Sequence, residues 1–432
     1  MGKLFILVTA LIQLCFGYEN LGDTDGTWSL LGFTGYAGEI VINNLTGSSL
    51  FYWLFQATQG NITSDKLPII LWLQGGQGCS GSTGMVFENI GPFGINNNTQ
   101  PAINPYTWIS NYHVIMVDFP IGAGYSIANS PSDMKNTTMA SVAYLYNFLV
   151  KLSIKYPTWF NRDVYIFGES YSGHFIPGIA YTILMNNKSP NAQKVFSLKG
   201  IAIGDPWIEA YTQTQYYAEY AYSSGLIDLE EKGIIESYQQ EIIVALNASD
   251  YNKANNADLY LEYELFAKYS GNADPFNVRY FYDNYNMGQV PAWMNLASTK
   301  SMLHAPLNVT WVSCNGTIGN AWTVDIMSSM ANYLPYILDN IRVLIWNGQD
   351  DFDVTNIGTQ ALLAKLNWQN IKGFTSARKH IWKVNKEVAG YAISYNNLSF
   401  VLTLKAGHLF SHDQPQNAKD LVIRFINNQG FN

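Results

Sequence analysis

The chain has few charged residues, few cysteines and, after its first residues, no long uninterrupted apolar run. Only 13% of the 432 residues are charged, and the formal net charge is -8 with a pI of about 5.2. No basic patch is present, which argues against a nucleic-acid partner. Because 48% of the residues are hydrophobic and 15% are aromatic, the chain can bury a large core and is not expected to be disordered.

The start of the chain is typical of a targeting segment. Lys3 supplies a positive charge ahead of an apolar run over residues 4–16, which is short for a membrane span. Gly17 is a small residue at the expected cleavage site. We therefore predict a signal peptide over residues 1–17 and no membrane anchor in the mature chain. The expected destination is a lysosome-like or vacuole-like compartment, or the extracellular space.

One of the three cysteines, Cys15, lies in the predicted signal peptide. The other two, Cys79 and Cys314, are expected to form one disulfide bond in the oxidising secretory pathway, with two buried free thiols as the alternative. Secretion also agrees with nine sequons for N-glycosylation, at Asn44, Asn61, Asn97, Asn136, Asn187, Asn247, Asn308, Asn315 and Asn397.

Continuous apolar runs alternate with segments of helical periodicity along most of the chain. Strands are predicted at 67–73, 113–118, 164–168, 197–204, 341–346 and 398–404, and helices at 136–156 and 416–426. An early antiparallel hairpin is predicted over residues 39–56. This alternation favours an α/β fold with a mostly parallel central sheet covered by helices on both faces.

Between residues 211 and 293 the composition shifts towards Tyr, Glu, Asn and Ala, and no central-strand run occurs. We interpret 211–293 as an inserted helical cap. It separates a first part of the core, residues 18–210, from a second part, residues 294–432.

The segment Gly168-Glu-Ser-Tyr-Ser-Gly173 directly follows an apolar run. A strand, a sharp turn of small residues and a helix start are typical of a nucleophile elbow, which raises one serine hydroxyl above the end of a sheet. The candidate nucleophile is Ser170. The segment departs from the G-x-S-x-G pattern at Ser172, which is small but is not glycine.

Suitable partners for this serine follow in the order Ser, Asp, His, which is the order of α/β-hydrolases. A serine nucleophile needs an adjacent base, and the base needs an acid that fixes its tautomer. Of six histidines, only His408 directly follows a strand and a glycine turn late in the chain, with His412 as the rival. The acid is one of the three aspartates within residues 350–353.

The segment Gln74-Gly-Gly-Gln77 offers backbone N–H groups at the end of the predicted strand 67–73. Together with the N–H of Tyr171, these groups form a candidate oxyanion hole. An ordinary tight turn is the alternative.

Several segments together resemble those of serine carboxypeptidases. They are residues 72–80 (WLQGGQGCS), 119–126 (FPIGAGYS), 168–173 (GESYSG) and 406–415 (AGHLFSHDQP), and the similarity runs in order from about residue 35 to residue 425. The segment 347–351 (NGQDD) and Gln74 resemble the vitellogenic-like and retinoid-inducible branches. The resemblance implies an α/β-hydrolase fold that releases single residues from peptide C-termini, with no metal or cofactor.

The resemblance also implies a role for each motif residue: Ser170 as nucleophile, Asp351 as orienting acid, His408 as base, Gly76 and Tyr171 as oxyanion-hole donors, and Gln74, Glu169 and Glu88 as the site for the substrate α-carboxylate. Gln74 stands where many members have Asn, and Gln77 replaces a proline. Acyl transfer to an alcohol is an alternative reaction of the same fold. Protective binding of other lysosomal enzymes is an alternative role.

Overall fold

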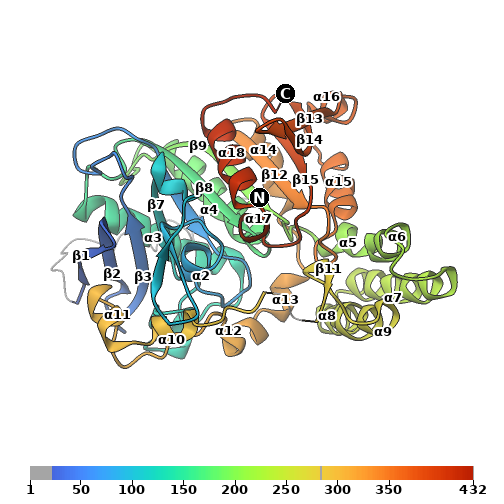
Figure 1. Ribbon diagram of the computed structural model, residues 1–432, viewed down its shortest axis with the longest axis horizontal. Coiled ribbons are helices and arrows are strands. Elements are labelled where there is room, and N and C mark those ends of the chain that lie inside the picture. Colours follow the sequence, from blue (N-terminus) through green and yellow to red (C-terminus); the bar gives the residue numbers. More distant parts are fainter. Residues whose placement is uncertain (1–21, 283–284, 432) are drawn as a thin grey trace.

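The computed structural model describes residues 22–282 and 285–431, so the predicted signal peptide lies outside the described residues. A large sheet forms the centre, with the strand order β1-β2-β3-β7-β4-β8-β9-β12-β15-β14-β13 (Figure 1). Its strands are β1 (Thr24–Leu30), β2 (Phe33–Asn43), β3 (Ser48–Phe55), β4 (Ile69–Leu73), β7 (His113–Val117), β8 (Asp163–Glu169), β9 (Ser197–Gly204), β12 (Arg342–Gly348), β13 (His380–Val384), β14 (Glu387–Tyr395) and β15 (Leu398–Thr403).

The central strands, from β7 to β15 in this order, run parallel. Both edges of the sheet are antiparallel, with β1, β2 and β3 on one side and β14 and β13 on the other. Parallel strands need crossover connections. The helix α3 (Thr138–Lys155) lies in the connection from β7 to β8, and α4 (Ser172–Asn187) lies in the connection from β8 to β9. The predicted fold class is confirmed, although the antiparallel edges are wider than the sequence indicates.

The sheet has a hydrophobic core on each face, as β4 illustrates. Ile69, Leu71 and Leu73 pack into the core beneath α3 and α4. Ile70 and Trp72 pack into the opposite core, which α2 (Ser82–Val86) and α18 (Pro415–Ile426) also line. Successive side chains of a strand point to opposite faces, so a strand covered on both sides needs the continuous apolar run that the sequence has here.

A helical lobe projects from one end of the sheet (Figure 1). It comprises α5 (Ala210–Gln213), α6 (Tyr217–Ser223), α7 (Leu229–Asn247), α8 (Tyr251–Tyr260), the single π-helical turn η4 (Leu261–Leu265) and α9 (Phe266–Ser270). The longest of these helices, α7, begins with a capping box in which Asp228 and Glu231 each accept the other's backbone N–H.

A short hairpin, β10 (Ala273–Asp274) and β11 (Asn277–Phe281), follows the lobe. The chain then returns to the main body, where Trp293 of α10 (Val290–Met294) stacks on Trp53 with ring centroids 6.4 Å apart. The domain boundaries at residues 210 and 293 stay a prediction.

The remaining elements are short. They are β5 (Phe93–Ile95), β6 (Pro101–Ile103), α11 (Ala297–Met302), α12 (Gly316–Asn320), α13 (Thr323–Ile326), α14 (Leu334–Leu338), α15 (Asn356–Ala364), α16 (Ile371–Thr375), α17 (Phe410–Asp413) and the 3₁₀ turns η1 (Trp108–Ser110), η2 (Pro131–Asp133), η3 (Thr214–Tyr216) and η5 (Ala331–Tyr333). Within the described ranges, no helix is long and apolar enough to cross a membrane.

Candidate active site

Ser170 lies in the sharp turn between β8 and α4, with a positive φ of 57°. Its N–H donates to the carbonyl of Gly204 at 2.8 Å, and its own carbonyl accepts the N–H groups of Gly173 and Trp207 at 2.8 and 3.0 Å. A Cβ at Gly75 would lie only 2.4 Å from the Cβ of Ser170. The turn is therefore held by the backbone and needs glycine beside it, as expected for a nucleophile elbow.

Ser172, the departure from the G-x-S-x-G pattern, is bound to the neighbouring strand. Its hydroxyl donates to the carbonyl oxygens of Leu73 and Gln74, at 2.8 and 3.1 Å, and it is fully buried. Ser170, by contrast, lines the main cavity. The two serines of the segment are thus distinguished by their surroundings.

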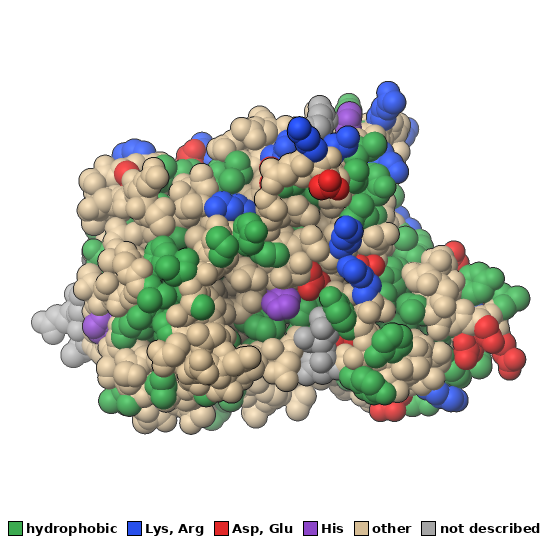
Figure 2. Space-filling view, viewed as in Figure 1, with side chains coloured by type: hydrophobic (Ala, Val, Ile, Leu, Met, Phe, Trp, Pro, Cys, Tyr) green, Lys and Arg blue, Asp and Glu red, His purple; other side chains and the backbone are tan. Residues whose placement is uncertain are grey.

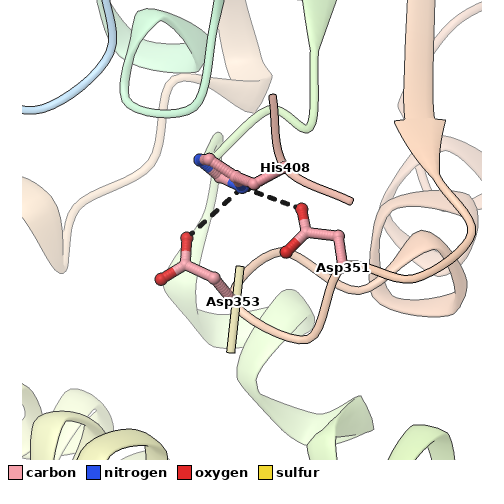
Figure 3. Close-up of side chains that lie close together, drawn as sticks. All are labelled: Asp351, Asp353 and His408. Carbon is pink, nitrogen blue, oxygen red and sulfur yellow. Dashed lines mark hydrogen bonds and ion pairs between the residues drawn. The ribbon is translucent and has the colours of Figure 1, made fainter. Parts of the chain in front are cut away.

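His408 and Asp351 form a buried pair, as Figure 3 shows. The His408 Nδ1 lies 2.8 Å from Oδ2 of Asp351, whose other oxygen accepts the N–H of Val354 at 3.1 Å. The His408 backbone N–H donates to the carbonyl of Phe276 at 2.7 Å, which fixes the start of the loop. Asp353 is a second acid beside the imidazole, with its Oδ2 at 3.7 Å from Nδ1.

The other candidates for these two positions lie elsewhere. Asp350 pairs with Arg279 at 3.6 Å. His412 stacks on Phe87 with ring centroids 4.7 Å apart and contacts the adjacent Asp413. Neither residue contributes to the imidazole–carboxylate pair.

The same group has the spacing of a possible metal site, because Asp351, Asp353 and His408 each bring one ligand atom within 4.8 Å of the others. The 2.8 Å separation between Nδ1 and Oδ2 is that of a direct hydrogen bond. A carboxylate bonded to Nδ1 orients the imidazole and leaves Nε2 for proton transfer. We therefore interpret the group as an acid–base pair.

The pKa of Asp351 is raised by its burial and, secondarily, by the charge of Asp353. Hydrogen bonds from the Asp205 carboxyl group and from the Val354 N–H act in the opposite direction. These hydrogen bonds favour the ionised carboxylate, whereas burial has the largest effect on its pKa.

A buried polar cluster lies at the ends of β4 and β8. Gln74 donates through Nε2 to Glu88 at 2.8 Å and to Glu169 at 3.0 Å, and its Oε1 accepts the indole N–H of Trp72 at 3.0 Å. The three residues Gln74, Glu88 and Glu169 are 6%, 0% and 2% exposed. Gly84 makes room for this cluster, because a Cβ there would lie 2.3 Å from the Trp72 nitrogen.

Burial raises the pKa of Glu169 well above its ordinary value, and the neighbouring Glu88 raises it further. The pKa of Glu88 is also raised by burial, while hydrogen bonds with Glu169 and Gln74 oppose the shift. Two carboxyl groups this close disfavour double ionisation. The pair therefore retains a proton under mildly acidic conditions.

Gly76 and Tyr171 border the same cavity as Ser170 and His408. Gly76 has a φ of +79°, and a Cβ there would lie 2.3 Å from the sulfur of Cys79, so only glycine fits. Tyr171 stands at the N-terminus of α4, where backbone N–H groups have no partner within the helix. Both positions are suited to offer N–H groups to a developing oxyanion.

The expected disulfide is formed between Cys79 and Cys314, which are 235 residues apart. Two backbone hydrogen bonds flank it, from Ser80 N–H to the Ser313 carbonyl at 2.8 Å and from Asn315 N–H to the Gly78 carbonyl at 2.9 Å. The bridge therefore supports the glycine-rich loop from outside.

The cavity that these groups share has a volume of about 470 Å³. It lies between residues of the main body and residues of the helical lobe. Figure 2 shows a histidine and acidic side chains exposed close together where the main body meets the lobe. One wall comes from the strand ends with Ser170 and Gln74. The other comes from α8 and η4 of the lobe.

Asp205, which lies behind the acid–base pair, was not predicted as a site residue from the sequence. It is fully buried, and its Oδ1 accepts the N–H of Gly348 at 2.7 Å and the amide of Asn347 at 3.3 Å. Burial and the nearby Asp351 raise its pKa well above the ordinary value. An acid directly after a central strand, at the end of β9, is a signal that could have indicated it.

Asp258 and Glu262, on the lobe side of the cavity, were also not identified. They are one helical turn apart, so they share a helix face, and each is 5% exposed. Their i, i+4 spacing is ordinary for solvent-facing acids, and only the packing of the lobe reveals that they are buried.

The sheet, the elbow and the position of the cavity define an α/β-hydrolase. A family model described as serine carboxypeptidase matches residues 26–428, so the chain belongs to the serine carboxypeptidase family. The predicted family and fold class are thereby confirmed, and the protein is a serine-type carboxypeptidase.

Several known proteins are similar over most of the chain. Two from Dictyostelium discoideum, a probable serine carboxypeptidase CPVL and serine carboxypeptidase S10 family member 1, are each 32% identical. They cover 96% and 99% of this chain, and 81% and 100% of their own lengths are aligned. The crystal structure of a prohormone-processing carboxypeptidase from Saccharomyces cerevisiae has a TM-score of 0.79 and 25% identity, covering 91% of each chain.

Proposed function

We propose that the protein releases single residues from peptide C-termini through a covalent acyl-enzyme on Ser170. The observation that carries this proposal is a buried cluster of one amide and two carboxyl groups, Gln74 with Glu88 and Glu169, on the same cavity as a serine in an elbow. We infer that this cluster binds the substrate α-carboxylate. An endopeptidase or a general esterase has no need of such a site. A free α-carboxylate beside the scissile bond is what distinguishes a C-terminal residue.

In this mechanism Nε2 of His408 takes the proton from the Ser170 hydroxyl as its oxygen attacks the scissile carbonyl carbon. Asp351 holds the imidazole in the required tautomer and stabilises its cation. The N–H groups of Gly76 and Tyr171 stabilise the negative charge of the tetrahedral intermediate. The imidazolium then gives its proton to the departing amino group, and the C–N bond breaks.

Deacylation repeats these steps with water. His408 removes a proton from water, whose oxygen attacks the acyl carbon, and the Ser170 oxygen leaves with the proton returned by the imidazole. The product is the shortened peptide with a new C-terminal carboxylate.

The substrate α-carboxylate is bound by donors in the buried cluster. Both amide N–H groups of Gln74 donate to Glu88 and Glu169 in the free protein, so substrate binding exchanges one of these hydrogen bonds for one to the substrate. The proton retained by the two glutamates allows the pair to donate as well. A substrate carboxylate would otherwise meet two negative charges. Recognition therefore depends on the raised pKa values of the two glutamates.

We further infer that the protein enters the secretory pathway, for a lysosome-like compartment or the extracellular space. The Cys79–Cys314 disulfide and the sequons support this inference. Three sequon asparagines, at 187, 315 and 397, use their side-chain nitrogen in hydrogen bonds to backbone carbonyls. The other six are exposed, so we expect carbohydrate on those rather than on the three.

The test compares N-blocked dipeptides with a free C-terminal carboxylate against the same dipeptides as C-terminal amides. The purified protein should release the C-terminal amino acid from the free acids far faster. Ser170→Ala should lower kcat by about 10⁴-fold or more, because the nucleophile is lost. Ser172→Ala is the matched control, because its hydroxyl only bonds to backbone carbonyls; it should retain activity at a cost of about 1 kcal/mol of stability.

Equal rates on acids and amides would refute the carboxylate site. Labelling by a fluorophosphonate at a serine other than Ser170 would refute the nucleophile. Transfer of the acyl group to an added alcohol without hydrolysis would favour the acyltransferase alternative.

A further inference from the structure

The lobe side of the cavity carries two buried acids that the proposed mechanism does not use. Asp258 lies on α8 and Glu262 on η4, and both line the cavity that contains Ser170. Each is 5% exposed. One oxygen of each carboxyl group, Oδ1 of Asp258 and Oε1 of Glu262, has no hydrogen-bond partner.

Asp353 adds a third carboxyl group to the same wall. Its Oδ1 accepts a long hydrogen bond of 3.5 Å from the hydroxyl of Tyr263, and its Oδ2 lies 3.7 Å from His408. Within the described ranges, no lysine or arginine forms an ion pair with any of the three acids. The three acids are therefore acceptors without a lysine or arginine donor, and Asp353 has His408 beside it.

Burying carboxylates without a cation is unfavourable, and the electrostatics of the site reflect this. Burial raises the pKa of Asp258 to about 8, and the charge of Asp353 contributes to the shift. The pKa of Glu262 is raised well above its ordinary value by burial and then by Asp353. A bound cation would replace this repulsion by attraction and would lower both pKa values.

This acidic wall is distinct from the carboxylate-binding cluster. The main charge acting on Glu169 is Glu88, whereas the main charge acting on both Asp258 and Glu262 is Asp353. The two sets also come from different parts of the fold, namely the ends of β4 and β8 for one and the helical lobe with the loop after β12 for the other. The acidic wall reaches His408 through Asp353. Because the side chain on the acyl side of the scissile bond is further from the C-terminal carboxylate than that of the leaving residue, we assign the wall to the acyl-side residue.

We propose that Asp258, Glu262 and Asp353 bind the side chain of a lysine or arginine at the penultimate position of the substrate. This proposal rests on the proposed function of the same cavity. The free carboxylate oxygens accept N–H donors of the ammonium or guanidinium group. Tyr217 and Tyr263, which also line the cavity, offer ring surfaces to the aliphatic stem and the cation.

The test uses N-blocked dipeptides that share a C-terminal leucine and differ only in the penultimate residue. Arginine is compared with citrulline, and lysine with norleucine, because each pair has a similar shape with and without charge. For the wild-type protein near neutral pH, kcat/KM should favour the charged member of each pair by about tenfold or more, the effect of charged hydrogen bonds.

The ratio of kcat/KM for arginine over citrulline is the readout for variants. Asp258→Asn and Glu262→Gln should each reduce this ratio by about tenfold, and the double variant should abolish the preference. Glu264→Gln is the matched control, since Glu264 belongs to the same π-helical turn but is exposed; its ratio should equal that of the wild type. A purely structural role would change stability and would change kcat/KM on both substrates equally.

The pH dependence gives a second readout. The groups that face Asp258 and Glu262 are Asp353 and the hydroxyls of Tyr217 and Tyr263. Because the pKa of Asp258 is about 8 and that of Glu262 is also raised, both are neutral in acid, and the ratio should increase from about pH 6 to pH 9 as they ionise. A ratio of one at both pH values would overturn the proposal.

Release of leucine from the dipeptide acids distinguishes an error in the proposed function from an error in the role of the acidic wall. If no dipeptide acid releases leucine, the proposed function is wrong. If citrulline and arginine substrates release leucine equally well, only the acidic wall has been misinterpreted. A preference for arginine at the C-terminal position instead would overturn the assignment to the penultimate residue.

Discussion

Asp351 and Asp353 compete for the same imidazole nitrogen, at 2.8 and 3.7 Å from Nδ1 of His408. Only Asp351 is within hydrogen-bond distance, and it is fully buried and fixed by the Val354 N–H. Asp351→Asn should therefore lower kcat by about 10⁴-fold, because the amide favours the wrong tautomer. Asp353→Asn should have a much smaller effect on a dipeptide acid with a neutral penultimate residue.

The measurement is kcat for both variants on that neutral substrate, with thermal unfolding as a check on folding. If Asp353→Asn lowers kcat as much as Asp351→Asn does, the assignment of Asp351 as the acid that orients His408 is wrong.

At the level of residues, the sequence predicts the site residues that lie in glycine-rich turns directly after a strand. Ser170 and Gly76 stand in glycine-rich turns directly after strands, and His408 follows a strand and a glycine. Asp205, Asp258 and Glu262 carry no such mark. They become site residues only because chain segments far apart in sequence are packed around one cavity.

At the level of elements, strands buried on both faces were predicted well, and strands at the edges were not. β4 and β7 are buried along their whole length, as are the last five residues of β9, because both faces of the sheet are covered there. β13 has three exposed residues among its five, His380, Ile381 and Lys383, so its sequence lacks that signal. The two-residue strand β10 is too short to give any periodicity.

Residues at the ends of three elements should make the KM for dipeptide acids depend on pH. Gln74 follows β4, Glu169 ends β8 and Glu88 follows α2, and all three meet in a buried cluster. Burial raises the pKa of both glutamates. As pH rises through these pKa values, the cluster becomes more negative and repels the substrate carboxylate. KM for dipeptide acids should therefore increase from about pH 5 to pH 8, with less change in kcat.

Glu88→Gln removes one of the two coupled carboxyl groups and should shift this increase in KM to a different pH. The exposed variant Glu264→Gln is the control and should leave the profile unchanged. A KM that stays constant over this pH range in the wild type would contradict a shared proton at the cluster.

At the scale of the whole molecule, many acids are buried. Among residues 22–282 and 285–431, nine acidic residues have a pKa raised in the fold, with burial as the largest cause in each: Glu39, Glu88, Asp118, Glu169, Asp205, Asp258, Glu262, Asp350 and Asp351. Two of these values lie near neutrality, at about 6 for Asp118 and about 8 for Asp258. Three other aspartates, Asp65, Asp133 and Asp325, have a lowered pKa.

The sign of the resulting effect on stability follows from proton linkage. Above about pH 4 the unfolded chain releases these protons, whereas the folded chain retains them up to the raised pKa values. The folded state therefore binds more protons, and the free energy of unfolding falls as pH rises. The aspartates with lowered pKa act in the opposite sense, but only below about pH 4. His113, whose pKa is lowered by burial, opposes the trend between about pH 5 and 7.

We therefore expect the protein to be more stable near pH 5 than near pH 8, which suits the first of the two destinations proposed above, a lysosome-like compartment. Thermal or denaturant unfolding across this range measures the slope directly. Asp258→Asn removes a group with a folded pKa of about 8 and keeps its shape, so the variant should lose part of the slope. Relative to the wild type, it should gain stability at pH 8 and not at pH 5. If the free energy of unfolding instead increases from pH 5 to pH 8, the buried acids are ionised in the folded protein. The proposal that a protonated Glu88–Glu169 pair binds the substrate carboxylate would then be wrong.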